Sequence, residues 1–299
     1  MAPRSYLFVP GNRPERFDKA FASGADSVIV DLEDAVPPDQ KVATRETVRA
    51  WLSAERSTVL RINGADTLWF ADDLALCRLP GVAAVMLAKT ERIENVAALR
   101  DGPPIIALIE SALAFENLRA IAGAPNVQRL AFGAIDFQLD MGMRATFDDL
   151  VYFRSQLALA SRLAGLSSPI DSPSTALDDD EEVASEAVRA SRLGFGAKLC
   201  IHPRQVGVVN RSFTPTDEEL DWARRVLAAS ARSNGAAVSL DGRMVDRPVV
   251  ERARMLLERV HGSPTESGPV PDQATGRLQL RIQPVDATNW LNTSARALD

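Results

Sequence analysis

One pattern is repeated from Ser5 to about Asn210: a short apolar run, a polar or Gly/Pro-containing turn, and a stretch with helical periodicity. Such repeats are typical of βα units, in which a crossover helix returns the chain to the same end of a parallel sheet. The runs predicted to be strands are SYLFV (5–9), SVIVD (27–31), TVLRI (58–62), AAVML (83–87), IIALI (105–109), VQRLAF (127–132), SSPID (167–171) and AKLCI (197–201). Eight such strands predict an α/β fold, a closed (β/α)8 TIM barrel; a doubly wound open sheet built from the same units is the alternative.

Apolar residues recur at spacings of three and four between these strands, which predicts helices there. The predicted helices are Glu15–Ser23, Gln40–Ala54, Thr67–Arg78, Glu91–Leu99, Ser111–Ile121, Phe147–Leu163 and Asp178–Leu193. Beyond the eighth strand, Thr216 followed by three acidic residues marks the start of a further helix over Pro215–Ala231. A loop and a last helix over Val249–Val260 form a C-terminal extension.

Three parts are predicted along the chain. Residues 1–234 form the barrel domain, 235–261 a C-terminal segment and helix, and 262–299 a linker and tail. The linker is rich in Pro, Gly, Ser and Thr, whereas LQLRIQPV in the tail alternates like a strand that has no neighbour to pair with. We expect the tail to dock on its own barrel or on a neighbouring subunit.

Composition and net charge limit the classes of function that the chain can have. With 46% hydrophobic and 25% charged residues, the chain can bury the core of an ordinary globular protein. The net charge of -6 argues against a nucleic-acid surface. The apolar stretch Tyr6–Pro10 is too short for a signal peptide. The sequence also has no apolar run long enough to suggest a membrane partner. Cys77 and Cys200 lack the spacing of a disulfide framework or a zinc site, so we expect a cytoplasmic protein.

Polar residues follow nearly every predicted strand. In (β/α)8 enzymes the chemistry takes place at the carboxyl ends of the strands. The residues at these ends are Pro10–Asn12, Asp31, Glu33, Asp34, Arg61, Asn63, Lys89, Glu110, Asp136, Asp171 and His202. The sequence therefore predicts a functional site at this rim of the barrel.

Glu110 and Asp136 follow consecutive predicted strands, with one helix between them. Because neighbouring strands place their carboxyl ends side by side, the two carboxylates can converge. Carboxylates without a nearby Cys or His favour Mg²⁺ or Mn²⁺ over zinc. The alternative is that both residues are helix caps, as acidic residues often are after strands.

Arg61 stands at the end of an apolar strand, where an unpaired guanidinium would be costly. It suits a carboxylate or enolate oxygen of a substrate, or a structural ion pair with Glu33. Strand alternation points Asp31 and Glu33 the same way, so that one of them supports the metal through water or fixes Arg61. The alternative for DLEDAV is a solvated acidic loop.

Three further residues carry alternative roles. Lys89 and Lys198 lie at strand ends, where a Lys can form a Schiff base with a carbonyl substrate, but a Lys in a strand is more often ion-paired. His202 has the side chain of a general base, whereas a His before Pro more often orients its neighbours.

Seven ordered blocks over about residues 3–260 resemble the citrate lyase beta subunit family, with its citramalyl-CoA and malyl-CoA lyase relatives in the wider HpcH/HpaI aldolase group. These blocks are SYLFVPGNRPERFDKA, ADSVIVDLEDAVPPDQK, LRINGADTLWFADDL, IIALIESALAFENL, LAFGAIDFQLDMG, GFGAKLCIHPRQV and DGRMVDRPV. The resemblance implies that Glu110 and Asp136 bind Mg²⁺ and that Arg61 contacts an α-oxo acid.

The resemblance also implies contacts to coenzyme A and between subunits. Lys19, helped by Asn12 and Arg13, is similar to a residue that meets coenzyme A phosphates; the alternative is an ordinary solvated Lys on a helix. The segment GRMVDRP resembles a lid that crosses to a neighbouring subunit and closes its site with an acid, here Asp246. An active homotrimer, or a hexamer of trimers, is therefore expected.

The activity implied by the resemblance is that of an oxo-acid lyase. A 3-hydroxyacyl-CoA thioester of the citramalyl, malyl or citryl type would be cleaved to an acyl-CoA and an α-oxo acid, with Arg61 stabilising the enolate and Asp246 moving a proton. The alternatives are a citrate lyase beta subunit acting on a carrier-protein thioester, a thioesterase or malate synthase-like enzyme, and a non-catalytic oxo-acid-binding barrel. Ser172–Thr175 depart from the family pattern, which leaves the substrate open.

Overall fold

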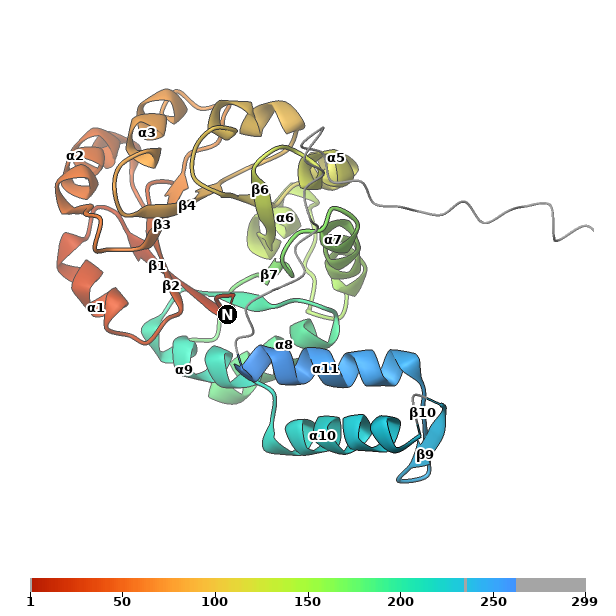
Figure 1. Ribbon diagram of the computed structural model, residues 1–299. Helices are drawn as coiled ribbons and strands as arrows, with labels where there is room; N and C mark the ends of the chain where they lie inside the picture. Colours follow the sequence, from red (N-terminus) through yellow and green to blue (C-terminus); the bar gives the residue numbers. More distant parts are fainter. Residues whose placement is uncertain (1, 234–235, 262–299) are drawn as a thin grey trace, which may run out of the picture. The chain divides into compact units, whose positions relative to one another are not determined.

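Eight parallel strands close into a barrel in the computed structural model, which describes residues 2–233 and 236–261 (Figure 1). The strands are β1 (Ser5–Pro10), β2 (Ser27–Asp31), β3 (Thr58–Ile62), β4 (Val82–Leu87), β5 (Ile105–Ile109), β6 (Val127–Phe132), β7 (Ile170–Asp171) and β8 (Ala197–Cys200). Each pairs with the next in sequence, and β8 pairs back onto β1 through Tyr6 and Leu199. The prediction of a (β/α)8 TIM barrel is confirmed, and the open sheet is wrong.

Strand β7 is shorter than the sequence predicts. Only Ile170 and Asp171 form the strand, whereas the predicted run began at Ser167. Pro169 precedes it directly, and proline has no N–H to donate to a neighbouring strand. The β6–β7 pairing is consequently reduced to Ala131 opposite Ile170.

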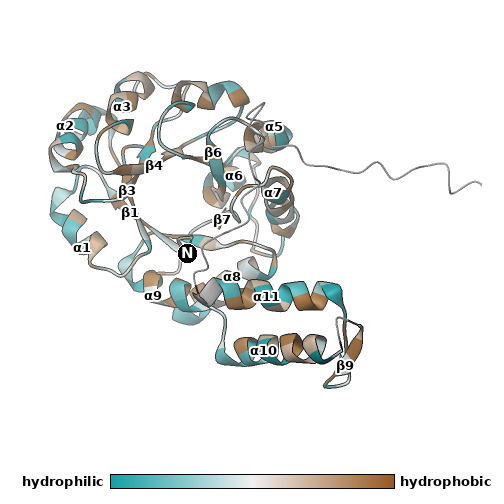
Figure 2. Cartoon of the chain, viewed as in Figure 1, coloured by the Kyte–Doolittle hydropathy of each residue, from teal (hydrophilic) through white to brown (hydrophobic). Residues whose placement is uncertain are grey.

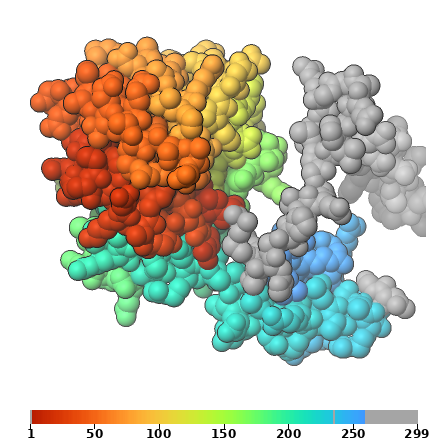
Figure 3. Space-filling view, turned by 60° about the vertical axis from the view of Figure 1, so that its left-hand side comes forward, coloured from red at the N-terminus to blue at the C-terminus, as the bar shows by residue number. Residues whose placement is uncertain are grey.

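Helices cover the outside of the barrel between consecutive strands. They are η1 (Pro14–Arg16), α1 (Phe17–Phe21), η2 (Pro38–Gln40), α2 (Lys41–Trp51), α3 (Phe70–Cys77), η3 (Ile93–Leu99), α4 (Ala112–Glu116), α5 (Leu118–Ala122), α6 (Ala134–Asp140), α7 (Val151–Leu163), α8 (Asp180–Arg192) and α9 (Pro203–Ser212). Figure 3 shows the start of the chain, in red, against the teal segment of α9, as closure of the barrel requires. The predicted helix over 111–121 is divided at Asn117 into α4 and α5.

Side chains alternate along the strands between two apolar layers. The barrel interior is filled by Tyr6, Ile29, Val59, Met86, Ile106, Leu108, Ala131, Ile170, Ala197 and Leu199. The intervening strand residues, such as Leu7, Val28 and Cys200, pack outward against the helices. Figure 2 shows this arrangement as brown strands inside helices that carry teal residues on their outer faces. Strand periodicity thus aims every second side chain at the interior and leaves the strand ends free for polar groups.

The C-terminal extension consists of α10 (Asp217–Arg232), a hairpin of β9 (Val238–Leu240) and β10 (Arg243–Val245), and α11 (Arg247–His261). Thr216 accepts a hydrogen bond from the N–H of Glu219 and so caps α10, as its sequence predicts. Buried residues from both helices and β10 form a hydrophobic cluster of their own, so α10 packs with the extension. The predicted linker and tail, 262–299, lie outside the described residues.

No helix of the described ranges is both long and apolar enough to cross a membrane.

Candidate functional site

A pocket of about 300 Å³ lies at the carboxyl ends of the barrel strands. It is lined by Phe8, Pro10, Asp31, Asp34, Ala35, Arg61, Leu108, Glu110, Gly133, Ala134, Ile135, Asp136, Pro173, Leu199 and Ile201. Three of the predicted site residues, Arg61, Glu110 and Asp136, are therefore brought together. The pocket lies at the rim where the sequence predicts a functional site.

Glu110 directly follows β5 and is only 4% exposed. Its Oε1 accepts a hydrogen bond of 2.7 Å from the backbone N–H of Lys89, which adopts a left-handed φ of 48°. Gly133 makes the position of this side chain possible, because a Cβ there would lie 2.4 Å from Oε2 of Glu110. The glycine of FGAIDF is thus explained by close approach to the Glu110 carboxylate.

Burial raises the pKa of Glu110 to about 8. The carboxylates of Asp136 and Glu33 contribute to this net rise, whereas the hydrogen bond from the Lys89 N–H and the charge of Arg61 oppose it. A cation next to Glu110 would favour the ionised form of its carboxylate. The electrostatics of the pocket therefore suit a cation.

Asp136 lies in the first turn of α6 and is partly exposed. The N-cap of α6 is Gly133, and the cap of α4 is Ser111, whose hydroxyl accepts from the N–H of Ala114. Neither Glu110 nor Asp136 accepts a capping hydrogen bond in the described chain, so the capping alternative does not account for the pair.

The two carboxylates fit a hard divalent ion. Across residues 2–233 and 236–261, no group of three or more His, Cys, Asp or Glu side chains is placed to hold a metal. Mg²⁺ commonly takes only one or two protein carboxylates and keeps waters or substrate oxygens in its other positions. Glu110 and Asp136 are two carboxylates of this kind and leave positions on the ion open to water or substrate. A site closed by four protein ligands would leave no such position.

Arg61 is held by two acids of the β2 end. Its Nε donates to Oδ1 of Asp31 at 2.7 Å, its Nη2 to Oδ2 of Asp31 at 2.5 Å, and its Nη1 lies 3.1 Å from Oε2 of Glu33. The guanidinium also lies over the ring of Phe8, 4.7 Å from its centre. Burial lowers the pKa of Arg61, but Asp31 and Glu33 raise it more, so the net shift is upward. The structural ion pair with Glu33 is observed, and Arg61 lines the pocket as well.

Glu33 is buried between two cations. Besides Arg61, it accepts from Nζ of Lys89 at 3.0 Å, and Asp34 donates its backbone N–H to the same carboxylate. This arrangement contradicts a solvated acidic loop for DLEDAV, since Asp31 and Glu33 are 1% and 5% exposed. Glu33 orients Arg61 and does not itself line the pocket. A direct catalytic role for Glu33 stays a prediction.

Both strand-end lysines are ion-paired. Burial lowers the pKa of Lys89, but its bond to Glu33 raises it, with a net upward shift that disfavours the neutral amine of an imine-forming Lys. Lys198 lies 2.9 Å from Asp171 and 3.1 Å from Glu186 of α8. Since its neighbours Ala197 and Leu199 fill the barrel interior, Lys198 points outward to the helices. The ion-pair interpretation accounts for both lysines.

His202 caps a helix. Its Nδ1 accepts from the backbone N–H of Arg204 at 3.2 Å, and Gln205 completes the capping box of α9. This geometry agrees with the orienting alternative and not with a general base. His202 is absent from the residues that line the pocket.

The three residues expected to contact coenzyme A share the β1–α1 segment. Asn12 donates from Nδ2 to Oε1 of Gln40 at 2.7 Å, while its buried Oδ1 has no hydrogen-bond partner among the described residues. Arg13 precedes η1 and Lys19 lies in α1, and both are exposed. Their role stays a prediction.

Asp246 lies on the extension, where its Oδ1 accepts from the N–H of Val249 at 3.4 Å in the first turn of α11. It is not among the residues that line the pocket of its own chain. Its expected role in closing the site of a neighbouring subunit stays a prediction.

Sequence reasoning missed a buried cation beneath the site. Nζ of Lys41 donates to the carbonyls of Leu32 and Glu33, both at 2.8 Å, and to Oδ1 of Asn63 at 2.7 Å. Lys41 thus fixes the turn that presents Asp31 and Glu33 to Arg61. The block DLEDAVPPDQK contains Lys41, but nothing in a helix-forming stretch distinguishes a buried Lys from a solvated one.

The fold and the pocket define a class, the (β/α)8-barrel proteins that gather carboxylates and an arginine at the carboxyl ends of their strands. Within that class, the chain belongs to the HpcH/HpaI aldolase/citrate lyase family, whose pattern matches residues 4–203. Family membership confirms the resemblance predicted from the seven blocks and, at the level of the family, the expected lyase class of enzyme.

Individual relatives cover most of the chain. A citrate lyase subunit beta-like protein of Deinococcus radiodurans is 37% identical over 273 residues, 85% of this chain and 96% of that protein. A (3S)-malyl-CoA thioesterase of Cereibacter sphaeroides is 32% identical over 86% of this chain and 94% of its own length. A solved structure from Mycobacterium tuberculosis, in complex with magnesium, acetoacetate and coenzyme A, has a TM-score of 0.78 and 39% identity, and covers 86% of this chain and 98% of its own.

Proposed function

We propose that this protein is a Mg²⁺-dependent carbon–carbon lyase that cleaves a 3-hydroxyacyl-CoA thioester of the malyl, citramalyl or citryl type to an acyl-CoA and an α-oxo acid. The observation that carries the proposal is the convergence of Glu110, Asp136 and Arg61 in one pocket at the strand ends. A pair of oxygen ligands next to a fixed guanidinium suits the chelation of an oxo acid and the stabilisation of an enolate.

Glu110 and Asp136 would hold the metal, and Mn²⁺ is an alternative ion with the same ligand preference. When bound, a divalent ion supplies Lewis-acid polarisation of the carboxylate and oxo oxygens. The support from this chain is the upward pKa shift of Glu110, which a nearby cation would reverse. The magnesium in the M. tuberculosis structure is consistent with this assignment.

Arg61 stabilises negative charge on the acyl enolate oxygen during cleavage. The hydroxyl proton passes to water or another base as the carbonyl of the oxo acid forms, the bond between that carbon and the acyl α-carbon breaks, and its electron pair passes to the thioester enolate, which takes up a proton to give the acyl-CoA. Asp31 and Glu33 keep the guanidinium in place by three contacts of 2.5–3.1 Å. Asp246 of a second copy would carry the proton to the acyl methyl group.

Coenzyme A phosphates would meet Lys19, with Asn12 and Arg13 beside it. The exposure of Arg13 and Lys19 and the unsatisfied Oδ1 of Asn12 support a polar ligand at this segment. The M. tuberculosis relative was solved with coenzyme A.

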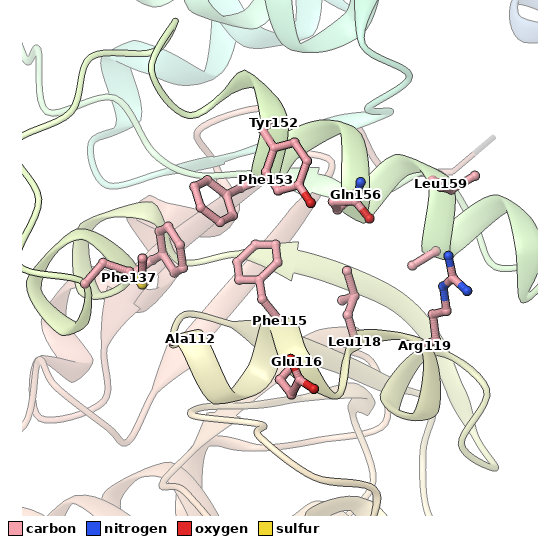
Figure 4. Close-up of a pocket in the computed structure, with 12 residues that line it drawn as sticks. Ala112, Phe115, Glu116, Leu118, Arg119, Phe137, Tyr152, Phe153, Gln156 and Leu159 are labelled. Atoms are coloured by element: carbon pink, nitrogen blue, oxygen red, sulfur yellow. The ribbon is translucent and has the colours of Figure 1, made fainter.

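A homotrimer would complete the site. Figure 4 shows a second pocket in which Phe115, Phe137 and Phe153 point toward one another between α4, α6 and α7. Around it, Leu139 and Tyr152 are 81% and 65% exposed. These aromatic and aliphatic side chains lie beside the polar Glu116, Arg119 and Gln156, and a mixed surface of this kind suits a second copy of the chain.

A thioesterase is the second candidate, because the C. sphaeroides relative carries that name. Hydrolysis and cleavage differ in their products, since only cleavage releases an α-oxo acid. A citrate lyase beta subunit would instead need a carrier-protein thioester and would leave free coenzyme A thioesters untouched. A malate synthase-like enzyme would run the reaction toward condensation, and a non-catalytic barrel would bind the oxo acid without turnover.

The test is a panel of malyl-CoA, citramalyl-CoA and citryl-CoA with Mg²⁺, with the oxo acid measured directly. Glu110→Gln and Asp136→Asn should each lower kcat/KM by about a hundredfold or more, because each removes one charged ligand. Glu94→Gln, the same change at an exposed position on η3, should have no effect. Undiminished cleavage in both ligand variants, or cleavage that survives chelation of divalent ions, would refute the proposal.

A further inference from the structure

Two loops form the part of the pocket wall that follows β7 and β8. The β7–α8 loop contributes Pro173 to the lining, and the β8–α9 loop contributes Ile201. Strand β7 has two residues, and its pairing with β8 ends at Asp171 opposite Lys198. Strand pairing therefore does not hold the residues after Asp171 against the β8–α9 loop.

One buried side chain connects the two loops. Gln205 of α9 is 2% exposed, and its Nε2 donates to the carbonyl of Ser174 at 3.0 Å and to that of Ala176 at 2.9 Å. Its Oε1 accepts from the backbone N–H groups of Ile201 at 2.9 Å and of His202 at 3.3 Å. A glutamine amide has two donors and two acceptor positions, and all four are used here. Every group belongs to one chain, so the connection does not require a second copy.

The partners of Gln205 require an amide side chain. Carbonyl groups only accept and backbone N–H groups only donate, so the reversed amide would face like with like on both sides. A glutamate would still accept from the two N–H groups, but its carboxylate has no proton to offer the carbonyls of Ser174 and Ala176. A buried carbonyl that loses its donor is destabilising.

Capping of α9 does not by itself explain a glutamine at this position. Gln205 is the third residue of α9 and completes its capping box. Helix α10 has the same kind of box, and there the third residue is Glu219, whose Oε2 accepts from the N–H of Thr216 at 3.0 Å. A carboxylate also suits the positive end of a helix better than a neutral group does. The amide donors of Gln205 therefore serve the β7–α8 loop and not the cap.

A second helix holds the same loop. Nη2 of Arg154 in α7 donates to Oγ of Ser172 at 3.3 Å. Ser172 and Ser174 are 4% and 2% exposed. Pro173 thus lies between two buried residues, one bonded to Arg154 and the other to Gln205. This arrangement fixes the place of Pro173 in the pocket wall.

We propose that Gln205 is a positioning residue of this site, which joins the β7–α8 loop to the β8–α9 loop and so sets the positions of Pro173 and Ile201 in the pocket wall. The inference rests on the proposed function. Gln205 does not line the pocket itself, so it acts through the two loops. Because Glu110 follows β5 and Asp136 lies in α6, loss of the connection should weaken thioester binding and leave Mg²⁺ affinity unchanged.

Two substitutions in the full chain separate the cap from the connection. Gln205→Glu keeps the acceptors of the capping box and removes both donors, whereas Gln205→Met, similar in size, removes all four hydrogen bonds. In both variants we expect KM for the thioester that the wild type cleaves best to rise about tenfold, with kcat within about threefold, because uniform binding is lost. The dissociation constant of Mg²⁺ should not change. A wild-type KM in Gln205→Glu would show that the glutamine is only a cap and would overturn the inference.

Asp178→Asn is the matched control. It breaks the ion pair between Arg204 and Asp178, which joins the same two loops at 2.5 Å but whose side chains are 68% and 81% exposed. Exposed ion pairs contribute little, so KM should stay within about twofold of the wild-type value. A rise in KM as large as that of Gln205→Glu would contradict the assignment of this role to Gln205.

Hydrogen exchange tests the connection without relying on catalysis. The N–H of Ala176 donates to Oγ of Ser174 at 3.3 Å, within the loop that Gln205 holds. Peptides over residues 172–177 should exchange faster in Gln205→Glu than in the wild type, whereas the N–H groups of the β8–α9 loop keep their acceptor. Unchanged exchange over 172–177 overturns the inference. A wild-type protein that cleaves no thioester refutes the proposed lyase, whereas an active wild type with unchanged KM in both variants contradicts the positioning role alone.

Discussion

Gly133 shows how a missing side chain sets the position of a candidate metal ligand. It ends the turn after β6, and the Glu110 carboxylate occupies the space that its Cβ would fill. Sequence alone places Glu110 and Asp136 at neighbouring strand ends, but the glycine between them has no visible role until the carboxylate is seen against it. The packing requirement is three-dimensional, so periodicity cannot reveal it.

We therefore expect Gly133→Ala to fold but to lose metal affinity. The added Cβ must displace Glu110, since it would lie 2.4 Å from Oε2 and 2.6 Å from Cβ of that residue. Titration with Mg²⁺ should show a dissociation constant about tenfold weaker or more, in the range seen when supporting groups of a metal site are removed. Gly123→Ala is the matched control, because its nearest neighbour would lie at 3.4 Å. Equal Mg²⁺ affinity in the two variants would contradict this account.

The pKa of Glu110 predicts a pH-dependent stability. The group titrates near 4.5 when exposed and at about 8 when buried, so between these values the folded protein holds a proton that the unfolded chain has lost. The metal-free protein should consequently lose stability as pH rises through this window, and the stabilisation by Mg²⁺ should grow with pH. Thermal melts from pH 5 to 8, with and without Mg²⁺, measure both. A Glu110→Gln variant that retains the full slope would show that another group is responsible.

At the scale of secondary structure, the strands were the most predictable part. Seven predicted strands agree with the structure to within a residue or two, because buried apolar runs bounded by turns have few alternatives. Two helices were not predicted. In α6, Ile135 and Leu139 are 50% and 81% exposed, so the apolar residues of this short helix do not mark its buried face, which is formed by Ala134 and Phe137. In α9, the sequence signals for the start of a helix are Pro203 at the first helical position and His202 as the N-cap residue.

The sequence predicts a loop where β9 and β10 form a hairpin. Its strands have three residues each and join through Asp241 and Gly242, both with positive φ. Asp-Gly is a strong hairpin signal, but the flanking runs are too short to alternate visibly. Short elements of this kind depend on packing, here against α10, that a local pattern does not contain.

The Asp171 ion pairs connect β7, β8 and α7, and their loss should destabilise the barrel. Asp171 is fully buried and accepts from Arg154 at 2.8 Å and from Lys198 at 2.9 Å. Asp171→Asn leaves two buried cations short of a partner and should cost about 3–5 kcal/mol in the free energy of unfolding. Chemical denaturation measures this. Glu186→Gln should lower the free energy of unfolding less, because Glu186 is partly exposed and Lys198 retains its ion pair with Asp171. Similar losses in the two variants would argue against the network.

For the whole molecule, the separate location of Asp246 makes a prediction about assembly. If each site is completed by a second chain, Glu110→Gln and Asp246→Asn inactivate different halves of it. Mixing the two inactive variants under conditions that exchange subunits should restore a fraction of wild-type activity, because hybrid oligomers contain some intact sites. Native mass spectrometry, with one of the two variants carrying a mass tag, shows whether hybrids form. Hybrids without any activity would show that each chain uses its own residues alone.

The short strand β7 gives the barrel a local weak point. A single residue pair joins it to β6 and two pairs join it to β8, whereas β1 and β2 share five. Amide hydrogens are protected from exchange by stable neighbours, so those of the β6–β8 seam should exchange through local opening well before those of the β1–β4 arc. Because Pro173 of the pocket wall lies two residues beyond the end of β7, we expect local opening of this seam to displace that part of the wall as well.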